Sequence, residues 1–187
     1  MPDTRRRPIL IVGLAIFTVQ VLRTAWVCDD SYITFRTADN IVNGFGPVWN
    51  ISERVQGFTH PLWLAIFTTA YAVTREAYYT SIALGAILSL GAVLFVGLAV
   101  ARTRWSLVVT IVALLSSKAF IDFSTSGIEN PLSHVLVVAF LWTWWQERPA
   151  IDRLRRLSLI GALLMTRSKA ISIPAIALPS ATGAITR

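Results

Sequence analysis

Two adjacent carboxylates, Asp29 and Asp30, stand where the first long apolar segment of the chain ends. They belong to the run Cys28-Asp29-Asp30-Ser31-Tyr32-Ile33-Thr34-Phe35-Arg36. Ionised carboxylates are costly to desolvate, so a pair at a membrane boundary is expected to face a polar cavity or a catalytic cleft just outside the bilayer. The sequence therefore predicts that the chemistry of this protein is located at residues 29 and 30.

The composition indicates a membrane protein. The chain is 55% hydrophobic and 14% charged, whereas ordinary soluble domains carry about 25% charged residues. The net charge of +7 comes from short basic clusters between apolar runs, which membrane topology explains better than nucleic-acid binding does, so we predict no nucleic-acid partner. The single cysteine, Cys28, excludes an intrachain disulfide framework and a cysteine-built metal site, and a packing role is favoured for it.

The apolar runs predict an all-α, polytopic transmembrane protein with about five membrane helices, one re-entrant or interfacial segment and a helical outer loop. The first run, residues 8–27, follows Arg5-Arg6-Arg7 and is long enough to cross about 30 Å of hydrocarbon. A cleaved signal peptide is the alternative, but the run contains Arg23 and no small-x-small cleavage site precedes Cys28. The later candidate helices cover residues 79–101, 105–120, 131–145 and 157–179.

Residues 28–60 are the one long polar stretch, and we predict them to be the first outer loop. The run Asn43-Gly44-Phe45-Gly46-Pro47 divides this loop into two halves. The first half is predicted to be a short helix along the membrane surface, and the second half, residues 48–58, is predicted to be extended. In the first half, one face is shared by Asp29, Tyr32, Ile33 and Arg36.

Residues 61–73 decide the topology. This apolar segment of about 13 residues is short for a full crossing, so it is predicted to be re-entrant or interfacial. If it does not cross, the later basic clusters fall inside, as the positive-inside rule requires; if it crosses, they move outside. We therefore favour a multi-pass protein of the cytoplasmic membrane with its N-terminus inside. The basic residues that this topology places inside are Arg102, Arg104, Arg148, Arg153, Arg155 and Arg156.

The same topology places Asp122 and Glu129 on the outer side with Asp29 and Asp30. Four acidic groups can then line one cleft; alternatively, Asp122 and Glu129 mark a solvated turn between two helices. Two histidines complete the set of candidates. His60, at the membrane edge beside Pro61, has the stronger claim to a site, and His134, in an apolar helix, is predicted to be a hydrogen-bonded packing residue.

Two separated motifs carry a resemblance to a known family. The first motif consists of Asp29-Asp30-Ser31-Tyr32-Ile33-Thr34-Phe35-Arg36, Asn43-Gly44-Phe45-Gly46, Asn50, Glu53-Arg54-Val55-Gln56-Gly57-Phe58-Thr59 and Leu62-Trp63. The second motif is Thr125-Ser126-Gly127-Ile128-Glu129-Asn130-Pro131-Leu132. Together they resemble the polytopic GT-C glycosyltransferases, in particular the terminal arabinofuranosyltransferase group of bacterial cell-wall synthesis, over about residues 8–165.

The resemblance implies a polyprenyl-phosphate sugar donor, with arabinofuranose as the expected sugar, and a cell-wall glycan as acceptor on the outer face of the membrane. It implies that Asp29 is the general base that removes a proton from the acceptor hydroxyl, with Asp30 as its supporting or substrate-binding neighbour. The leaving lipid phosphate needs positive charge or a metal, for which Arg36 and Arg54 are the candidates, although either can equally be a solvated loop residue.

The remaining predicted substrate-binding residues are His60 and Glu129. A divalent cation among Asp29, Asp30, Glu129 and the donor phosphate is compatible with the oxygen ligands, but the spacing does not require a metal.

Departures from the family leave alternatives open. Family members are longer, so residues 1–170 are predicted to be the N-terminal part of a GT-C-like transmembrane domain, and residues 171–187 an atypical tail. Where the family has Arg-Pro followed by an acid, this chain has Thr166-Arg167-Ser168-Lys169. The alternatives to an active enzyme are an inactive membrane fragment or assembly partner and, third, a small transporter, which is weakest because the acids cluster at a boundary.

Overall fold

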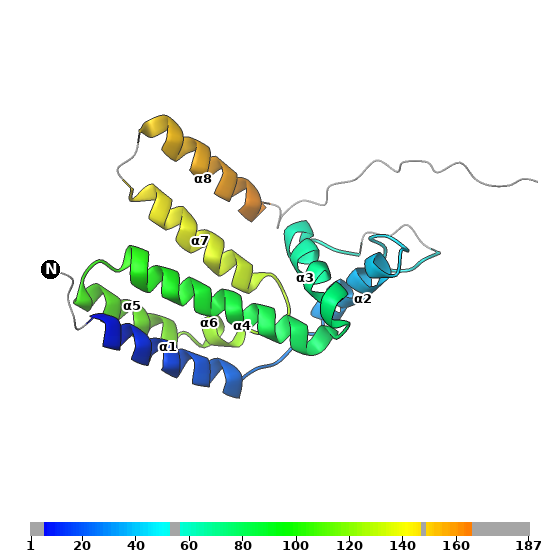
Figure 1. Ribbon diagram of the computed structural model, residues 1–187, viewed down its shortest axis with the longest axis horizontal. Coiled ribbons are helices and arrows are strands. Elements are labelled where there is room, and N and C mark those ends of the chain that lie inside the picture. The colour runs from blue at the N-terminus through cyan, green and yellow to red at the C-terminus, as the bar shows by residue number, and fades with distance from the viewer. Residues whose placement is uncertain (1–5, 53–56, 147–148, 166–187) are drawn as a thin grey trace, which may run out of the picture.

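The computed structural model describes residues 6–52, 57–146 and 149–165. Every regular element within these ranges is helical (Figure 1), which confirms the predicted all-α class. In chain order the elements are α1 (Arg6–Arg23), α2 (Ser31–Val42), α3 (Pro61–Thr74), α4 (Ala77–Phe95), the π-helical turn η1 (Val96–Val100), α5 (Arg104–Ser116), α6 (Lys118–Asp122), α7 (Asn130–Trp144) and α8 (Ala150–Met165).

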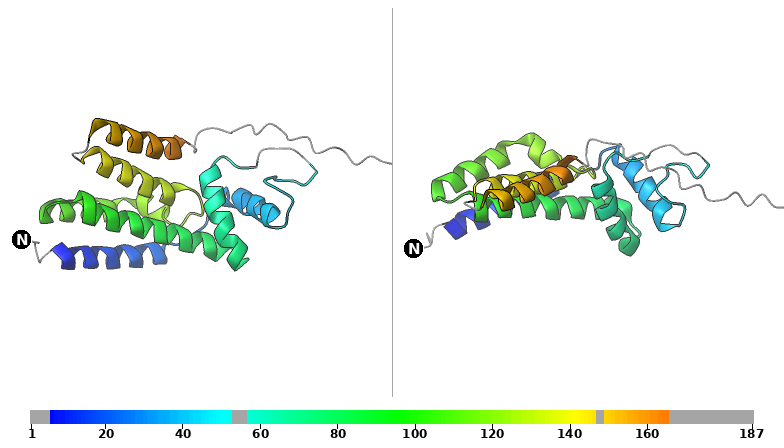
Figure 2. Two further views of the ribbon diagram at one scale, coloured as in Figure 1. Left: turned by 45° about the horizontal axis from the view of Figure 1, so that its top comes forward. Right: turned by 90° about the horizontal axis from the view of Figure 1, so that it is seen from above.

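The longer helices α1, α4, α5, α7 and α8 lie side by side along a common direction, and α2 and α3 gather at one end of them (Figures 1 and 2). Helix α4 is central, because it packs against α1, α3 and α7. We call the end formed by α2, α3 and residues 122–129 the loop end. We call the opposite end the basic end; it holds Arg6, Arg7, Arg102, Arg104, Arg153, Arg155 and Arg156.

One described helix, the continuous segment Ala77–Val100 of α4 and η1, is both long and apolar enough to cross a membrane. Two shorter apolar helices, α3 and α5, do not reach that length. Helix α3 lies at the loop end beside α2 in each view rather than along the bundle (Figure 2). A helix long and apolar enough to cross a membrane is thus found where the sequence predicted one, at residues 79–101.

The helical outer loop is held on α3 by an aromatic core. Phe35 of α2 stacks on Phe67 of α3 with 4.9 Å between the ring centroids, and Trp63 lies beside Phe67 at 6.4 Å. All three side chains are buried. Aromatic side chains bury large areas and gain further from offset or tilted contacts, so α2 and α3 form one packed unit. The predicted helix at the start of the outer loop is confirmed as α2.

Several predicted boundaries differ from the structure. The run 105–120 is two helices, because Ser117 is extended (φ −82°, ψ 98°) and its side chain caps α6 by accepting a hydrogen bond from the N–H of Phe120. Helix α1 ends at Arg23 rather than at residue 27. Helix α8 begins at Ala150 rather than at Leu157, and the predicted end at residue 179 lies outside the described residues.

The predicted extended half of the outer loop is wrong for residues 48–52, which form bends and a turn. The reason is that hydrogen bonds from α2 fold this part of the chain back onto the helix. The side-chain amide of Asn40 donates to the carbonyls of Val48 (2.7 Å) and Trp49 (3.2 Å). The prediction for His134 is correct in its packing, since its ring lies 4.5 Å from that of Phe120. It is wrong in its hydrogen bond, because the buried Nδ1 has no partner among the described residues.

Candidate functional site

The two motifs, far apart in the sequence, lie against each other at the loop end. The backbone N–H of Cys28 donates to the carbonyl of Ser126 at 2.9 Å. The indole N–H of Trp63, buried at the start of α3, donates to the carbonyl of Gly127 at 3.1 Å. The chain between α6 and α7 is therefore fixed between the starts of α2 and α3.

Small side chains make this contact possible. Ser124, Thr125 and Ser126 are fully buried. Gly127 has a φ of 81°, a left-handed conformation that costs other residues energy, and a Cβ added there would lie 2.8 Å from the Cβ of Ser31. A Cβ added at Gly85 of α4 would lie 2.5 Å from the carbonyl oxygen of Ser124. The second motif thus needs its small residues for close packing.

A cleft of about 440 Å³ opens where the motifs meet. Three of the predicted site residues, one from each of three separate segments, lie along it: Asp30, His60 and Glu129. Hydroxyl groups of Thr34 and Thr59 add hydrogen-bonding capacity to the walls. The remaining described residues of the lining are Ile33, Gly57, Phe58 and Ile128. A hollow that combines carboxylates, an imidazole and hydroxyl groups with apolar side chains suits a hydroxyl-rich ligand that also has apolar faces.

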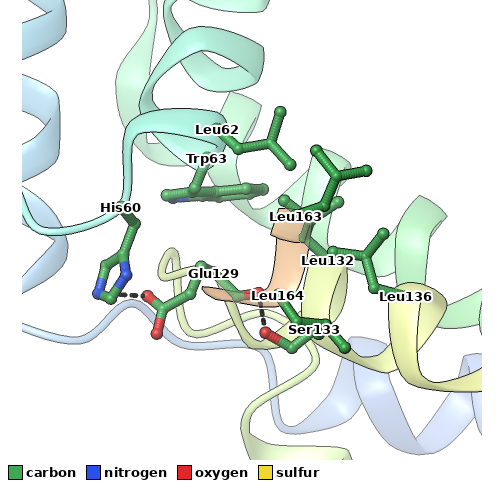
Figure 3. A pocket seen from close by; sticks show the side chains of 9 residues that line it. All are labelled: His60, Leu62, Trp63, Glu129, Leu132, Ser133, Leu136, Leu163 and Leu164. Carbon is green, nitrogen blue, oxygen red and sulfur yellow. Dashed lines mark hydrogen bonds and ion pairs between the residues drawn. The ribbon is translucent and has the colours of Figure 1, made fainter. Parts of the chain in front are cut away.

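His60 and Glu129 form the polar centre of this cleft. The Nε2 atom of His60 lies 3.1 Å from Oε2 of Glu129, as Figure 3 shows. His60 precedes α3, which begins at Pro61, and Glu129 precedes α7, so each residue is positioned by the start of a helix. Glu129 is 7% exposed, which excludes the alternative that it marks a solvated turn. The contact is an ion pair when the imidazole is protonated.

A second, narrower hollow lies on the other side of the pair. His60 and Glu129 also border it, and Figure 3 shows the indole of Trp63 over it. Its other walls come from α3, α7 and α8, namely Leu62, Leu132, Ser133, Leu136, Leu163 and Leu164. The polar pair therefore lies between the larger cleft and a hollow lined mainly by leucines.

Asp29 and Asp30 are both exposed at the start of α2, but their surroundings differ. The carboxylate of Asp29 accepts hydrogen bonds from the thiol of Cys28 (3.2 Å) and the backbone N–H of Asp30 (3.1 Å). These bonds, the thiol first, lower the pKa of Asp29, while burial raises the pKa of the Cys28 thiol. Asp29 is therefore held ionised and Cys28 protonated. Asp30 is the member of the pair that lines the cleft.

A divalent cation, which the sequence allows but does not require, has one compact set of candidate ligands among the described residues. One ligand atom from each of Cys28, Asp29 and Asp30 lies within 4.8 Å of the others. Glu129, which was predicted to join Asp29 and Asp30, lies in the cleft against His60 instead. The two carboxylates offer the oxygen ligands that hard cations prefer, whereas a protonated thiol does not.

Arg36 lies away from the cleft lining and holds the outer loop. Its guanidinium donates to the carbonyl of Trp49 (Nε, 3.0 Å) and to Oδ1 of Asn50 (Nη2, 2.9 Å), and it lies 4.7 Å from the centroid of the Trp49 ring. These contacts are those of a structural arginine. The other predicted phosphate ligand, Arg54, lies outside the described residues.

Asp122 does not line the cleft, and Asp29 is not in its described lining either, so the alternative in which four acids line one cleft is wrong. The side chain of Asp122 forms an ion pair with Lys118 one helical turn earlier in α6. Its carbonyl accepts a hydrogen bond from the indole N–H of Trp26 at 2.8 Å. Asp122 lines a different hollow, together with Gln20 and Arg23 of α1. The reason is that α6 turns this side chain toward α1.

A polar anchor between α2 and α3 was missed by the sequence reasoning. The hydroxyl of Tyr71 donates to Oδ1 of Asp39 at 2.8 Å, and the side-chain amide of Asn43 donates to the same atom at 2.9 Å. Arg75, in a left-handed conformation (φ 54°) after α3, donates to Asn43 at 3.4 Å. No spacing rule connects these positions, because the contact depends on the packing of two helices.

The chain is similar to two terminal beta-(1->2)-arabinofuranosyltransferases. It is 31% identical to the protein of Mycobacterium tuberculosis over 132 residues, which cover 64% of this chain and 20% of that relative. It is 31% identical to the protein of Corynebacterium glutamicum over 123 residues, which cover 63% of this chain and 18% of that relative. The chain therefore spans about a fifth of the length of these relatives. No family model and no solved structure matches it.

This similarity supports the family that the two motifs predict. Both relatives are much longer than this chain.

Proposed function

We propose that this chain forms part of a membrane glycosyltransferase. The enzyme transfers arabinofuranose from a polyprenyl-phosphate donor to a cell-wall glycan on the outer face of the cytoplasmic membrane. Residues 1–170 are assigned to the N-terminal part of its transmembrane domain. The observation that carries the proposal is the meeting of the two motifs at one cleft, in a chain similar to two terminal arabinofuranosyltransferases.

The arrangement of the helices supports a five-span topology with the N-terminus inside. Helices α1, α4 with η1, α5 with α6, α7 and α8 run in alternating directions along the bundle (Figure 1). Helix α3 stays at the loop end with α2, as a segment that does not cross would. The arginines at the basic end then face the cytoplasm, in agreement with the positive-inside rule.

Asp29 is assigned as the general base. Hydrogen bonds keep its carboxylate ionised, so it can take the proton of the acceptor hydroxyl. As that proton leaves, the hydroxyl oxygen forms a bond to the anomeric carbon, and the bond from that carbon to the donor phosphate breaks with its electron pair leaving on the phosphate. Asp30, beside it on the cleft, is assigned to bind the sugar hydroxyls.

His60 is assigned to the donor phosphate. A leaving phosphate needs positive charge where its own charge develops. Arg36 is occupied by Trp49 and Asn50, whereas His60 lies on the cleft with the buried carboxylate of Glu129 at 3.1 Å. Glu129 orients the ring through its contact with Nε2.

The deciding experiment measures transfer of labelled arabinofuranose from a polyprenyl-phosphate donor to an arabinan acceptor by the purified chain in lipid. Asp29→Asn is the test variant and Asp152→Asn, in the first turn of α8 at the basic end, is the matched control. Transfer that Asp29→Asn abolishes and Asp152→Asn preserves supports the proposal. Transfer that survives in Asp29→Asn removes Asp29 as the base.

An assembly partner or inactive portion is the second candidate, because the chain spans only about a fifth of its relatives. A chimaera separates the two candidates: residues 8–165 replace the matching segment of the Mycobacterium tuberculosis relative. If the isolated chain is inactive and the chimaera is active in an Asp29-dependent way, the chain is an incomplete catalytic portion. If the folded chimaera is inactive while the intact relative works, the site is not catalytic.

A further inference from the structure

We propose that the basic end carries a binding site for the phosphate group of an anionic phospholipid of the inner leaflet. A hollow of about 460 Å³ lies there between three elements: the turn η1, the start of α5 and the end of α7. These elements meet at the opposite end of the bundle from α2 and α3 (Figure 1), whose residues line the cleft. The described lining of the hollow consists of Ala99, Val100, Arg102, Thr103, Ser106, Trp142 and Trp145.

The charge of the surroundings is complementary to an anion. Arg102 lines the hollow, is exposed, and precedes α5. Arg104 follows in the first turn of α5, with its guanidinium 5.3 Å from the centroid of the Trp105 ring. Guanidinium groups bind phosphate through charge-assisted, often bidentate, hydrogen bonds. The start of α5 adds the positive end of a helix dipole.

The hollow is preorganised by contacts around it. The guanidinium of Arg6 donates to the carbonyl of Gly97 at 3.0 Å and to that of Ala101. These bonds satisfy carbonyl groups that would otherwise repel an anion at the turn. Thr103 and Ser106 cap α5 reciprocally, which fixes the first turn next to Arg102.

The aromatic wall selects a lipid over a free anion. Trp142 contacts the ring of Phe95 edge to face at 5.6 Å, which holds its indole in place, and Trp145 is 56% exposed. Indoles favour the headgroup level of a bilayer, where one side is apolar and the other wet. Ala99 and Val100 extend the apolar lining. A phosphodiester with a glycerol and acyl chains can contact both parts, whereas inorganic phosphate contacts only the basic part.

This inference rests on the proposed topology, and its test needs no transferase activity. The purified chain in phosphatidylcholine nanodiscs is titrated with phosphatidylglycerol carrying brominated acyl chains, and quenching of tryptophan fluorescence is recorded. Brominated phosphatidylcholine and inorganic phosphate are the comparison probes. We expect saturable quenching by phosphatidylglycerol that neither comparison probe reproduces or displaces.

Arg102→Gln is expected to weaken the apparent affinity about tenfold, the size of one lost charge-assisted hydrogen bond. Arg155→Gln makes the same charge change in α8, outside the lining of the hollow, and is expected to retain the affinity. Trp145→Leu, at an exposed position, is a second variant should Arg102→Gln fail to fold. Equal weakening by Arg102→Gln and Arg155→Gln, or displacement by inorganic phosphate, would overturn the proposal.

Discussion

The loop end and the basic end of the bundle are built in different ways. The loop end has a core of its own, in which Phe35, Trp63 and Phe67 are buried, and its polar side chains are fixed by hydrogen bonds between segments. At the basic end, arginines such as Arg102 and Arg104 stand exposed at helix ends. Buried, directed contacts hold a geometry, whereas exposed charges act over a distance and are screened. The loop end is therefore the place for stereospecific chemistry, and the basic end is suited to orientation in the membrane.

The largest expected effect is on the transfer rate, when one carboxylate charge is removed at the loop end or at the basic end. Asp29→Asn, at the loop end, is expected to lower the transfer rate about 10²–10⁴-fold, because it removes the base without changing the shape of the side chain. Asp152→Asn, at the basic end, is expected to leave the rate unchanged. Single-turnover assays in lipid measure both. A larger loss of kcat in Asp30→Asn than in Asp29→Asn would exchange the roles of the two acids.

The next effect concerns the ion pair of the cleft. His60→Gln and Glu129→Gln are each expected to raise KM for the donor about tenfold, with little further increase in the double variant, because each change removes the same charge-assisted contact. His134→Gln is the matched control, since His134 packs on Phe120 and does not line the cleft. Additive effects of His60→Gln and Glu129→Gln on KM would show that the two residues act independently.

A backbone test asks how much the close packing of the loop end contributes to stability. Gly127→Ala is expected to lower the free energy of unfolding by about 1–3 kcal/mol, since it combines a left-handed φ of 81° with a close approach to Ser31. Gly91→Ala in α4 meets nothing within 4 Å and is the control, with an expected effect of zero to slightly stabilising. Thermal unfolding of both variants and of the unchanged chain in the same detergent measures these differences in stability. Equal stability of Gly127→Ala and the unchanged chain contradicts the packing argument.

The smallest effect is a displacement of the pH profile. The thiol of Cys28 is the leading cause that lowers the pKa of Asp29, so Cys28→Ala is expected to raise that pKa. Because the proposed base Asp29 would act in its ionised form, the acidic limb of kcat/KM is expected to move to higher pH, while the rate near neutral pH stays within about twofold. Cys28→Ser, which keeps a hydrogen-bond donor, is expected to move the limb less. If the acidic limb of kcat/KM does not move in Cys28→Ala, the group that titrates in this limb is not Asp29.

Much of the local structure could be predicted from the sequence. Hydropathy located the apolar helices, including the one long enough to cross a membrane, and the spacing of Tyr32, Ile33 and Arg36 indicated the helix that is observed as α2. Boundaries were less certain where a single side chain decides them. Ser117 divides one apolar run into α5 and α6 by capping the second helix, a choice that average hydropathy does not record.

The amino-acid sequence by itself determined the helical class, the clustering of basic residues and the position of Asp29 and Asp30, because hydropathy, charge and neighbouring residues are local properties. Tertiary structure alone decided that Glu129 meets His60, that Arg36 holds a loop and that Asp122 turns toward α1. These outcomes depend on how helices distant in the sequence pack against one another. Small buried residues such as Gly127 permit that approach, and its geometry sets which polar groups become partners.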